Sequence, residues 1–207
     1  MSLRGPKEKK ERALGVRLGL KGERALSPKS AAVRKPYKPG AHGPTGRSKA
    51  LSEFGLQLRE KNKFKIMYGL NEENLKRIFT RAQAAKGALG AKMLEIMECR
   101  LDNVVFQLGW TPSRAAARQL VLHGHVFVNK RKVKSPGYEV EKGDVITINP
   151  ASNAIAAVVS RKELIEKYEA PSWLRMDAGK LEGEVLSAPT DLNPPFEINL
   201  LVDSFSK

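Results

Sequence analysis

The residues that most suggest chemistry are His123 and His125, which bracket a glycine in the sequence HGH. A zinc site needs three or four converging nitrogen, sulfur or carboxylate ligands. The only other histidine is His42 and the only cysteine is Cys99, so neither is close to this pair in the sequence. We therefore expect no metal and no cofactor, and interpret the two histidines as structural residues or as contacts to a nucleic acid.

Catalysis would need a nucleophile, a base and an orienting group that converge in a pocket. The sequence contains no GxSxG, P-loop or paired-carboxylate motif. Arg100-Leu101-Asp102 is similar to the RLD around the catalytic aspartate of some RNA pseudouridine synthases, but here it lies within a helical pattern and without their large α/β domain. We interpret Asp102 as a solvated or helix-pairing carboxylate and expect no enzymatic activity. A reduced RNA-modifying enzyme is the alternative.

Cations surround the same stretch of sequence. Arg100, Arg114 and Arg118 fall on two consecutive predicted helices, and their forked guanidinium groups suit phosphate oxygens. A predicted hairpin tip adds a second polar and basic group, made of Asn129, Lys130, Arg131 and Lys132, with Lys134 beyond it. Gly124 lies between the two groups, and a glycine lets backbones approach closely. Each cation alone could be ordinary surface charge, but the combination favours nucleic-acid binding.

The overall charge supports this interpretation. The formal net charge is +15, and residues 1–70 hold 18 Lys or Arg against 5 Asp or Glu. Such an excess repels itself unless a polyanion neutralises it. Because the cations are spread over several elements and no helix looks like a major-groove reader, a folded RNA is favoured over DNA.

Other bulk features indicate a soluble intracellular protein. A single cysteine excludes an internal disulfide, and the N-terminal sequence lacks the apolar core of a secretory signal. No apolar run approaches the ~20 residues of a membrane span. We therefore expect a cytoplasmic protein without a membrane partner.

Helical elements must position these residues. A first helix, capped by Ser48 or Ser52, carries the cations Arg59, Lys61 and Lys63 and ends at Gly69. Asn71 caps a second, which ends near residues 86–87. Periodicity predicts a third over about 92–108. A fourth begins at residues 111–113 and ends at His123, followed by Gly124.

After residue 124 the apolar period changes to two, which predicts a small antiparallel sheet over about 126–148. Residues 160–168 resemble a short helix capped by Ser160, and the alternation in residues 196–202 predicts a strand. Residues 1–47 are rich in Gly, Pro and cations and lack an apolar period, so we expect an extended arm without its own core.

A resemblance covers nearly the whole chain. The stretch ECRLDNVVFQLGWTPSRAAARQLVLHGHVFVNKRKVKSPGYEVEKGDVI resembles the RNA-binding module named after bacterial small-subunit ribosomal protein four, which some tRNA synthetases and pseudouridine synthases share. The segments KGERALSPKS, RKPYKPGAHG, FGLQLREKNKFKIMYGL, PSWLRMD and EINLLVDSFSK resemble the ribosomal protein family itself.

The resemblance implies direct binding to a multi-helix junction in the 5′ domain of small-subunit ribosomal RNA, and nucleation of subunit assembly. It also implies a place beside the channel through which messenger RNA enters, and contact with small-subunit protein five that affects decoding accuracy. Some bacterial members repress their own operon by binding its messenger RNA. Carried over to this chain, the RNA face includes Arg100, Asn103, Arg114, Arg118, His123, His125, Lys130, Arg131 and Lys132 in the module, and Arg34, Lys35, Tyr37, Lys38, His42 and Arg47 in the arm.

One departure from the family concerns zinc. Many relatives carry four arm cysteines that form a zinc site, whereas the matching positions here are Glu8, Glu11, Ala25 and Ser30. Alanine cannot ligate a metal, so we predict a zinc-free arm that is ordered by its own turns and by RNA.

The sequence therefore predicts an α+β protein: a basic extended N-terminal arm, a helical domain, and an inserted helix-plus-antiparallel-sheet RNA-binding module. The predicted ranges are 1–47 for the arm, 48–91 for the helical domain, 92–173 for the module, and 174–207 for a C-terminal segment that packs on the helical domain. A stand-alone RNA-binding regulator acting on messenger RNA is a second alternative.

Overall fold

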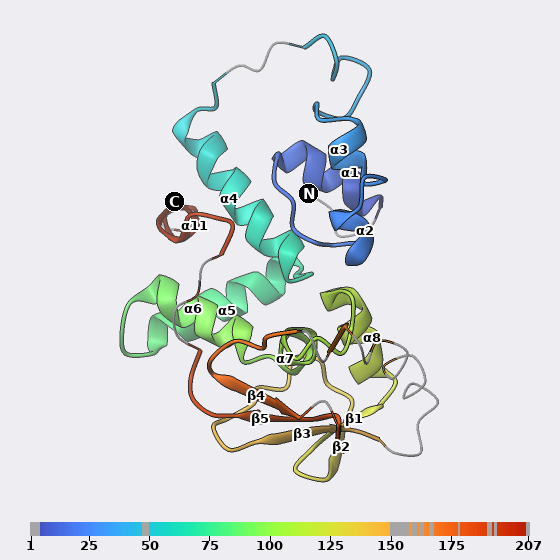
Figure 1. The fold of residues 1–207 in the computed structure, drawn as a ribbon. Helices are drawn as coiled ribbons and strands as arrows, with labels where there is room; N and C mark the ends of the chain where they lie inside the picture. Colours follow the sequence, from blue (N-terminus) through green and yellow to red (C-terminus); the bar gives the residue numbers. More distant parts are fainter. Residues whose placement is uncertain are drawn as a thin grey trace. The chain divides into compact units, whose positions relative to one another are not determined.

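A computed structural model describes residues 5–46, 50–149, 158, 161, 164–165, 168–177, 179–189, 192 and 194–205 (Figure 1). The chain divides into two compact units, one of Met1–Met93 with Asn193–Lys207 and one of Leu94–Leu192. The first is helical, and the second combines helices with an antiparallel sheet. The predicted α+β class is confirmed.

The first unit is built from helices α1 (Lys7–Leu14), α2 (Glu23–Leu26), α3 (Ala31–Arg34), α4 (Glu53–Met67), α5 (Glu72–Ala84) and α11 (Ile198–Asp203). Helix α6 (Leu89–Glu98) contains the boundary between the units. Two predicted caps are present, because Ser52 Oγ accepts from the Gly55 amide and Asn71 Oδ1 from the Asn74 amide. Such caps satisfy amides that the first turn leaves without a helical acceptor.

The arm is less extended than predicted, because polar side chains compensate for its missing apolar period. The carboxylate of Glu11, which is 2% exposed, accepts from the amides of Leu18 and Leu20 at 3.0 and 3.1 Å. Leu14 and Leu18 pack on Ile66 of α4 as a small core. The arm therefore contains three short helices held by hydrogen bonds to its own loops.

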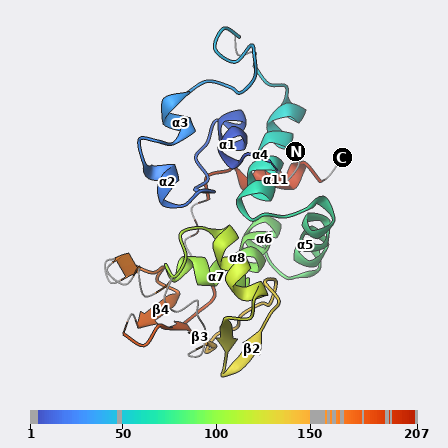
Figure 2. The same ribbon diagram turned by 90° about the vertical axis from the view of Figure 1, so that its right-hand side faces the viewer.

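The second unit contains α7 (Leu101–Gln107), α8 (Arg114–Leu122) and strands β1 (Val126–Val128), β2 (Arg131–Val133), β3 (Val145–Ile148), β4 (Leu174–Asp177) and β5 (Glu182–Val185). The strand order is β2-β1-β3-β5-β4, and every pair is antiparallel. Figure 2, like Figure 1, shows α7 and α8 on one side of this sheet. Their apolar residues form a single core with the strands, including Val105, Val121, Val126 and Ile146.

In place of the single helix predicted over 92–108 there are two helices, α6 and α7, because the helical conformation is interrupted at Arg100. The backbone of that residue is extended (φ −68°, ψ 136°) and forms an isolated antiparallel β-bridge with the backbone of Glu139. The amides of Leu101 and Asp102 donate to the carbonyls of Tyr138 and Pro136 instead of to the preceding turn. Hydrogen bonds to residues about 35 positions away therefore replace the helical ones here. The spacing of apolar residues in the sequence cannot indicate such an interruption.

The C-terminal predictions need two corrections. Residues 198–203 form helix α11, not a strand, because α11 packs against α4 with Leu201 buried. Strands β4 and β5 pair with each other and with β3, so residues 174–185 belong to the sheet and not to the helical unit. Most of the helix predicted at 160–168, with its cap Ser160, lies outside the described residues.

Candidate nucleic-acid interface

Asp102 organises two of the predicted arginines. It is 6% exposed and lies in the first turn of α7. Arg100 donates to both of its oxygens, from Nε to Oδ1 at 3.0 Å and from Nη2 to Oδ2 at 2.8 Å. Arg118 on α8 reaches Oδ2 at 3.5 Å. Asp102 is thus a helix-pairing carboxylate that fixes the guanidinium plane of Arg100 through two bonds, a geometry that suits arginine, and that attracts Arg118 more weakly.

Asn103 orients the third arginine. Arg114 Nε donates to Asn103 Oδ1 at 2.7 Å, and its guanidinium carbon lies 4.6 Å from the centre of the Phe106 ring. The Asn103 amide group donates in turn to Glu98 Oε2 at 2.6 Å. The predicted RNA contact Asn103 is only 1% exposed, so it supports an arginine and does not itself face solvent. Sequence reasoning missed Glu98, which links α6 to α7.

The HGH joint brings the hairpin lysines to the end of α8. His123 ends the helix, and Gly124 adopts the left-handed conformation with φ 72°, while its amide donates to Val121. A Cβ placed on Gly124 would lie 2.3 Å from Lys132 Cε and 3.2 Å from Lys134 Cε. The positive φ favours glycine at this position, and a larger residue would also push the flexible ends of the two lysines aside.

The hairpin tip presents cations on a defined turn. Asn129 and Lys130 have φ values of 50° and 65°, as a two-residue type I′ turn requires. Asn129 donates to Asp144 Oδ1 at 2.7 Å and accepts from the Val145 amide at 3.0 Å. These bonds fix the turn, and Asn129 is exposed like Lys130, Arg131 and Lys132, so the RNA contact of all four stays a prediction.

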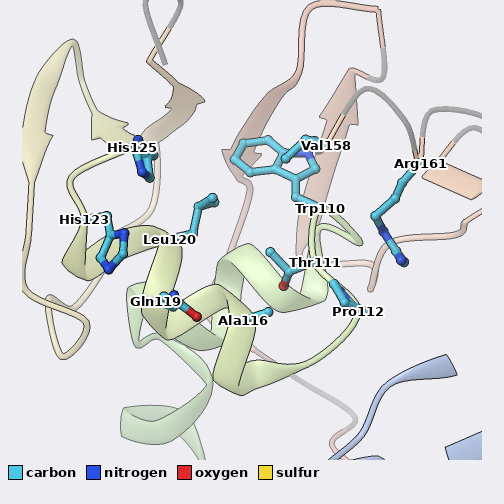
Figure 3. Close-up of a pocket in the computed structure, with 10 residues that line it drawn as sticks. All are labelled: Trp110, Thr111, Pro112, Ala116, Gln119, Leu120, His123, His125, Val158 and Arg161. Atoms are coloured by element: carbon cyan, nitrogen blue, oxygen red, sulfur yellow. The ribbon is translucent and has the colours of Figure 1, made fainter. Parts of the chain in front are cut away.

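A cavity of about 250 Å³ opens beside the joint and is lined by Trp110, Thr111, Pro112, Ala116, Gln119, Leu120, His123, His125, Val158 and Arg161 (Figure 3). Only His123 and His125 among these were singled out from the sequence. The others come from α8, from the segment before it and from residues far along the chain, so no local motif marks them.

The α4 cations are engaged within the first unit. Arg59 Nε donates to the Leu14 carbonyl at 3.0 Å, and Lys63 pairs with Glu60 at 2.6 Å. Lys61 pairs with Glu72 at 2.7 Å. Hydrogen bonds from Lys61 and Lys65 lower the pKa of the Glu72 carboxyl from 4.5 to about 2. In the structure these cations stabilise helix packing, and their contact with RNA stays a prediction.

The arm candidates Arg34, Lys35, Tyr37, Lys38 and His42 are exposed, and Arg47 lies outside the described residues. Arg12 donates to the carbonyls of Lys35 and Tyr37 at 2.8 and 3.1 Å and lies 5.0 Å from the Tyr37 ring centre. This contact fixes the turn that presents the neighbouring cations.

The positions that match the relatives' zinc ligands have other partners. Glu8 pairs with Arg24 at 3.0 Å, and Glu11 binds loop amides. Ser30 caps α3, and Ala25 is buried. Within the described ranges, no three His, Cys, Asp or Glu side chains are grouped to hold a metal ion. Nor does any helix in those ranges have the length and apolar character that a bilayer crossing requires.

Comparison with known proteins decides the family. Residues 2–98 match the model of the ribosomal protein S4/S9 N-terminal domain, and residues 99–146 match the S4 domain. Small ribosomal subunit protein uS4 of Natranaerobius thermophilus is 44% identical over 93% of each chain, and that of Caldicellulosiruptor bescii is 43% identical over 98% of each. The chain belongs to the uS4 family of small ribosomal subunit proteins. Its relatives are ribosomal proteins and not RNA-modifying enzymes, which confirms the non-enzymatic interpretation.

Proposed function

We propose that the chain binds small-subunit ribosomal RNA directly, in its 5′ domain, and nucleates assembly of the subunit. The observation that carries the proposal is the pre-oriented arginine group: Arg100 and Arg118 on Asp102, and Arg114 on Asn103. Asp102 contacts Arg100 and Arg118, and Glu98 contacts Asn103, the residue that orients Arg114. This part of the network therefore contains three guanidinium groups and two carboxylates. Fixed cations can select a folded RNA by the positions of its phosphates.

The test is binding of the purified chain to a 5′-domain transcript and to a length-matched transcript of another ribosomal RNA region, at about 0.15 M salt. Electrostatic attraction alone acts on both RNAs, so we expect a clear preference for the 5′-domain transcript. Equal affinity for the two transcripts contradicts the proposal.

The regulator alternative and the ribosomal role differ in where the protein resides. We propose that it resides in the cytoplasm as part of the ribosome and that repression of its own operon, through its messenger RNA, is at most an additional role. In a moderate-salt gradient of a cell extract we expect the chain to sediment with small subunits. Sedimentation only with free messenger RNA supports the regulator alternative.

For contact with protein five and an effect on decoding accuracy, we propose the exposed apolar face at the start of α4. Phe54 is 63% exposed, and Leu51 and Leu58 are each 44% exposed. Exposed apolar patches of this kind mark protein interfaces. Phe54→Ser should weaken binding to purified protein five, whereas Leu186→Ser, which alters an exposed leucine of the other unit, should not. Equal binding by the two variants contradicts the assignment.

A further inference from the structure

The described residues that line the cavity beside the HGH joint all belong to the second unit, and none of them is acidic. In the view of Figure 3, His123 and His125 lie on one side, Arg161 lies on the other, and Ala116, Gln119 and Leu120 of α8 lie between them. The lining therefore combines an apolar surface with aromatic nitrogens and an amide. Apart from Arg161, this lining differs from the group formed by Arg100, Arg114 and Arg118.

The size of the cavity limits its occupant. Pockets that take whole drug-sized ligands enclose roughly 300–1,000 Å³, and this one encloses about 250 Å³. One flat ring system therefore fits better than a larger molecule. Ala116 and Leu120 provide apolar contact, and the rings of His123 and His125, whose centres are 5.9 Å apart, provide aromatic faces.

Two polar groups could define the edge of such a ring. Trp110 is 1% exposed, and its Nε1 donates to no acceptor among the described residues. A buried donor without an acceptor is unfavourable, but this nitrogen is closed to solvent, so a base nitrogen or carbonyl reaches it only if the lining shifts. Gln119 is exposed at the cavity, and its carboxamide offers one donor and one acceptor, the arrangement that matches the N6 and N7 edge of adenine.

We propose that this pocket receives one unpaired, unstacked purine base of the bound RNA, with adenine preferred. The inference rests on the proposed RNA-binding function and adds a base-reading site to it. Proteins commonly recognise RNA sequence through splayed bases that stack on aromatic side chains and hydrogen-bond at their edges. Lys132 and Lys134, whose side chains lie close to Gly124 at the joint, provide cations near the pocket for the phosphates that flank the base.

The test fills the pocket without changing the charge. Ala116→Phe places a ring in the cavity, and Ala115→Phe places the same ring on the exposed neighbouring position of α8 as the control. The full-length variants are titrated with the 5′-domain transcript, and dimethyl sulfate probing reports the accessibility of adenine N1. We expect Ala116→Phe to weaken binding about tenfold, within the range contributed by one stacked base. It should also expose one unpaired adenine that the wild type and Ala115→Phe protect.

Circular dichroism shows whether Ala116→Phe folds, and a second variant tests the pocket if it does not. Gln119→Ala removes only an exposed side chain, and we expect it to weaken binding several-fold and to reduce the preference for adenine over guanine at the protected nucleotide. Unchanged affinity and protection in the folded pocket variants refute the base pocket. If the wild type itself shows no preference for the transcript, the proposed function fails instead. Normal RNA binding by Ala116→Phe with impaired incorporation into subunits assigns the pocket to a protein and also refutes the proposal.

Discussion

Asp102→Asn tests whether a buried carboxylate holds the arginine group together. The substitution keeps the shape of the side chain but removes its charge and replaces one acceptor oxygen with a donor. The Arg100 and Asp102 side chains are 13% and 9% exposed, so their pair is shielded from water. One charge-assisted hydrogen bond contributes about 1.5–3 kcal/mol, whereas the longer bridge to Arg118, which is 42% exposed, adds at most a few tenths. We therefore expect the free energy of unfolding to fall by about 2–3 kcal/mol.

The assay can follow the second unit alone. The sequence contains two tryptophans, Trp110 and Trp173, and both are buried in this unit at 1% exposure. Their fluorescence during urea unfolding therefore reports its stability. With a urea slope of roughly 1–2 kcal/mol per molar, the midpoint should fall by about 1–2 M.

Glu141→Gln is the matched control, because it makes the same charge change at an exposed position in the same unit. Surface substitutions of this kind change stability by about 0.5 kcal/mol or less. If Asp102→Asn is no more destabilising than Glu141→Gln, Asp102 does not organise the arginines and the reasoning behind the interface is wrong.

Three further predictions concern charge, backbone and pH. The double variant Arg114→Ala/Arg118→Ala should flatten the slope of log K against log salt for the 5′-domain transcript by roughly 0.7–0.9 per lost contact; an unchanged slope excludes phosphate contact by this pair. Gly124→Ala should destabilise the second unit more than Gly143→Ala in thermal melts, because both glycines have positive φ but only the Cβ at residue 124 meets a lysine side chain; equal losses would mean that the lysines move away freely. Because the pKa of Glu72 is about 2 in the folded chain and 4.5 ordinarily, its contribution to stability is present above about pH 4.5 and is lost as the pH falls toward 2. Stability measured against pH should therefore decline less in Glu72→Gln than in the wild type over that window, and parallel curves would refute the ion-pair assignment.

Local signals in the sequence predicted much of the fold. Asn71 caps α5 and Gly124 is left-handed, as predicted. Of the two candidates for each of the other caps, Ser52 caps α4 and Ser113, rather than Thr111, caps α8. Each depends on neighbours within a few residues, so the residue type is sufficient to indicate it.

The missed features depend on contacts between distant residues. The break at Arg100 arises because amides of α7 bind carbonyls near residue 137. Strands β4 and β5 are four residues each, and their sequences, LRMD and EGEV, contain only three apolar residues, so the sequence signal for them is weak without the partner β3. The pocket brings Trp110 together with Val158 and Arg161, which are about fifty residues away. Lys130, Arg131 and Lys132 are exposed, but the side chains of Arg100, Lys61 and Lys63 are largely buried in ion pairs. Their intramolecular acceptors, such as Asp102, became clear only in three dimensions.

The way in which Glu11 and Arg12 hold the N-terminal arm has a chemical consequence. Carboxylate and guanidinium groups bonded to backbone amides and carbonyls contain no sulfur that peroxide could attack, whereas thiolates are oxidised stepwise and then lose their metals. The N-terminal arm of this chain should therefore keep its fold during oxidative stress and in strong chelators, conditions under which an arm held by a metal–cysteine site would unfold.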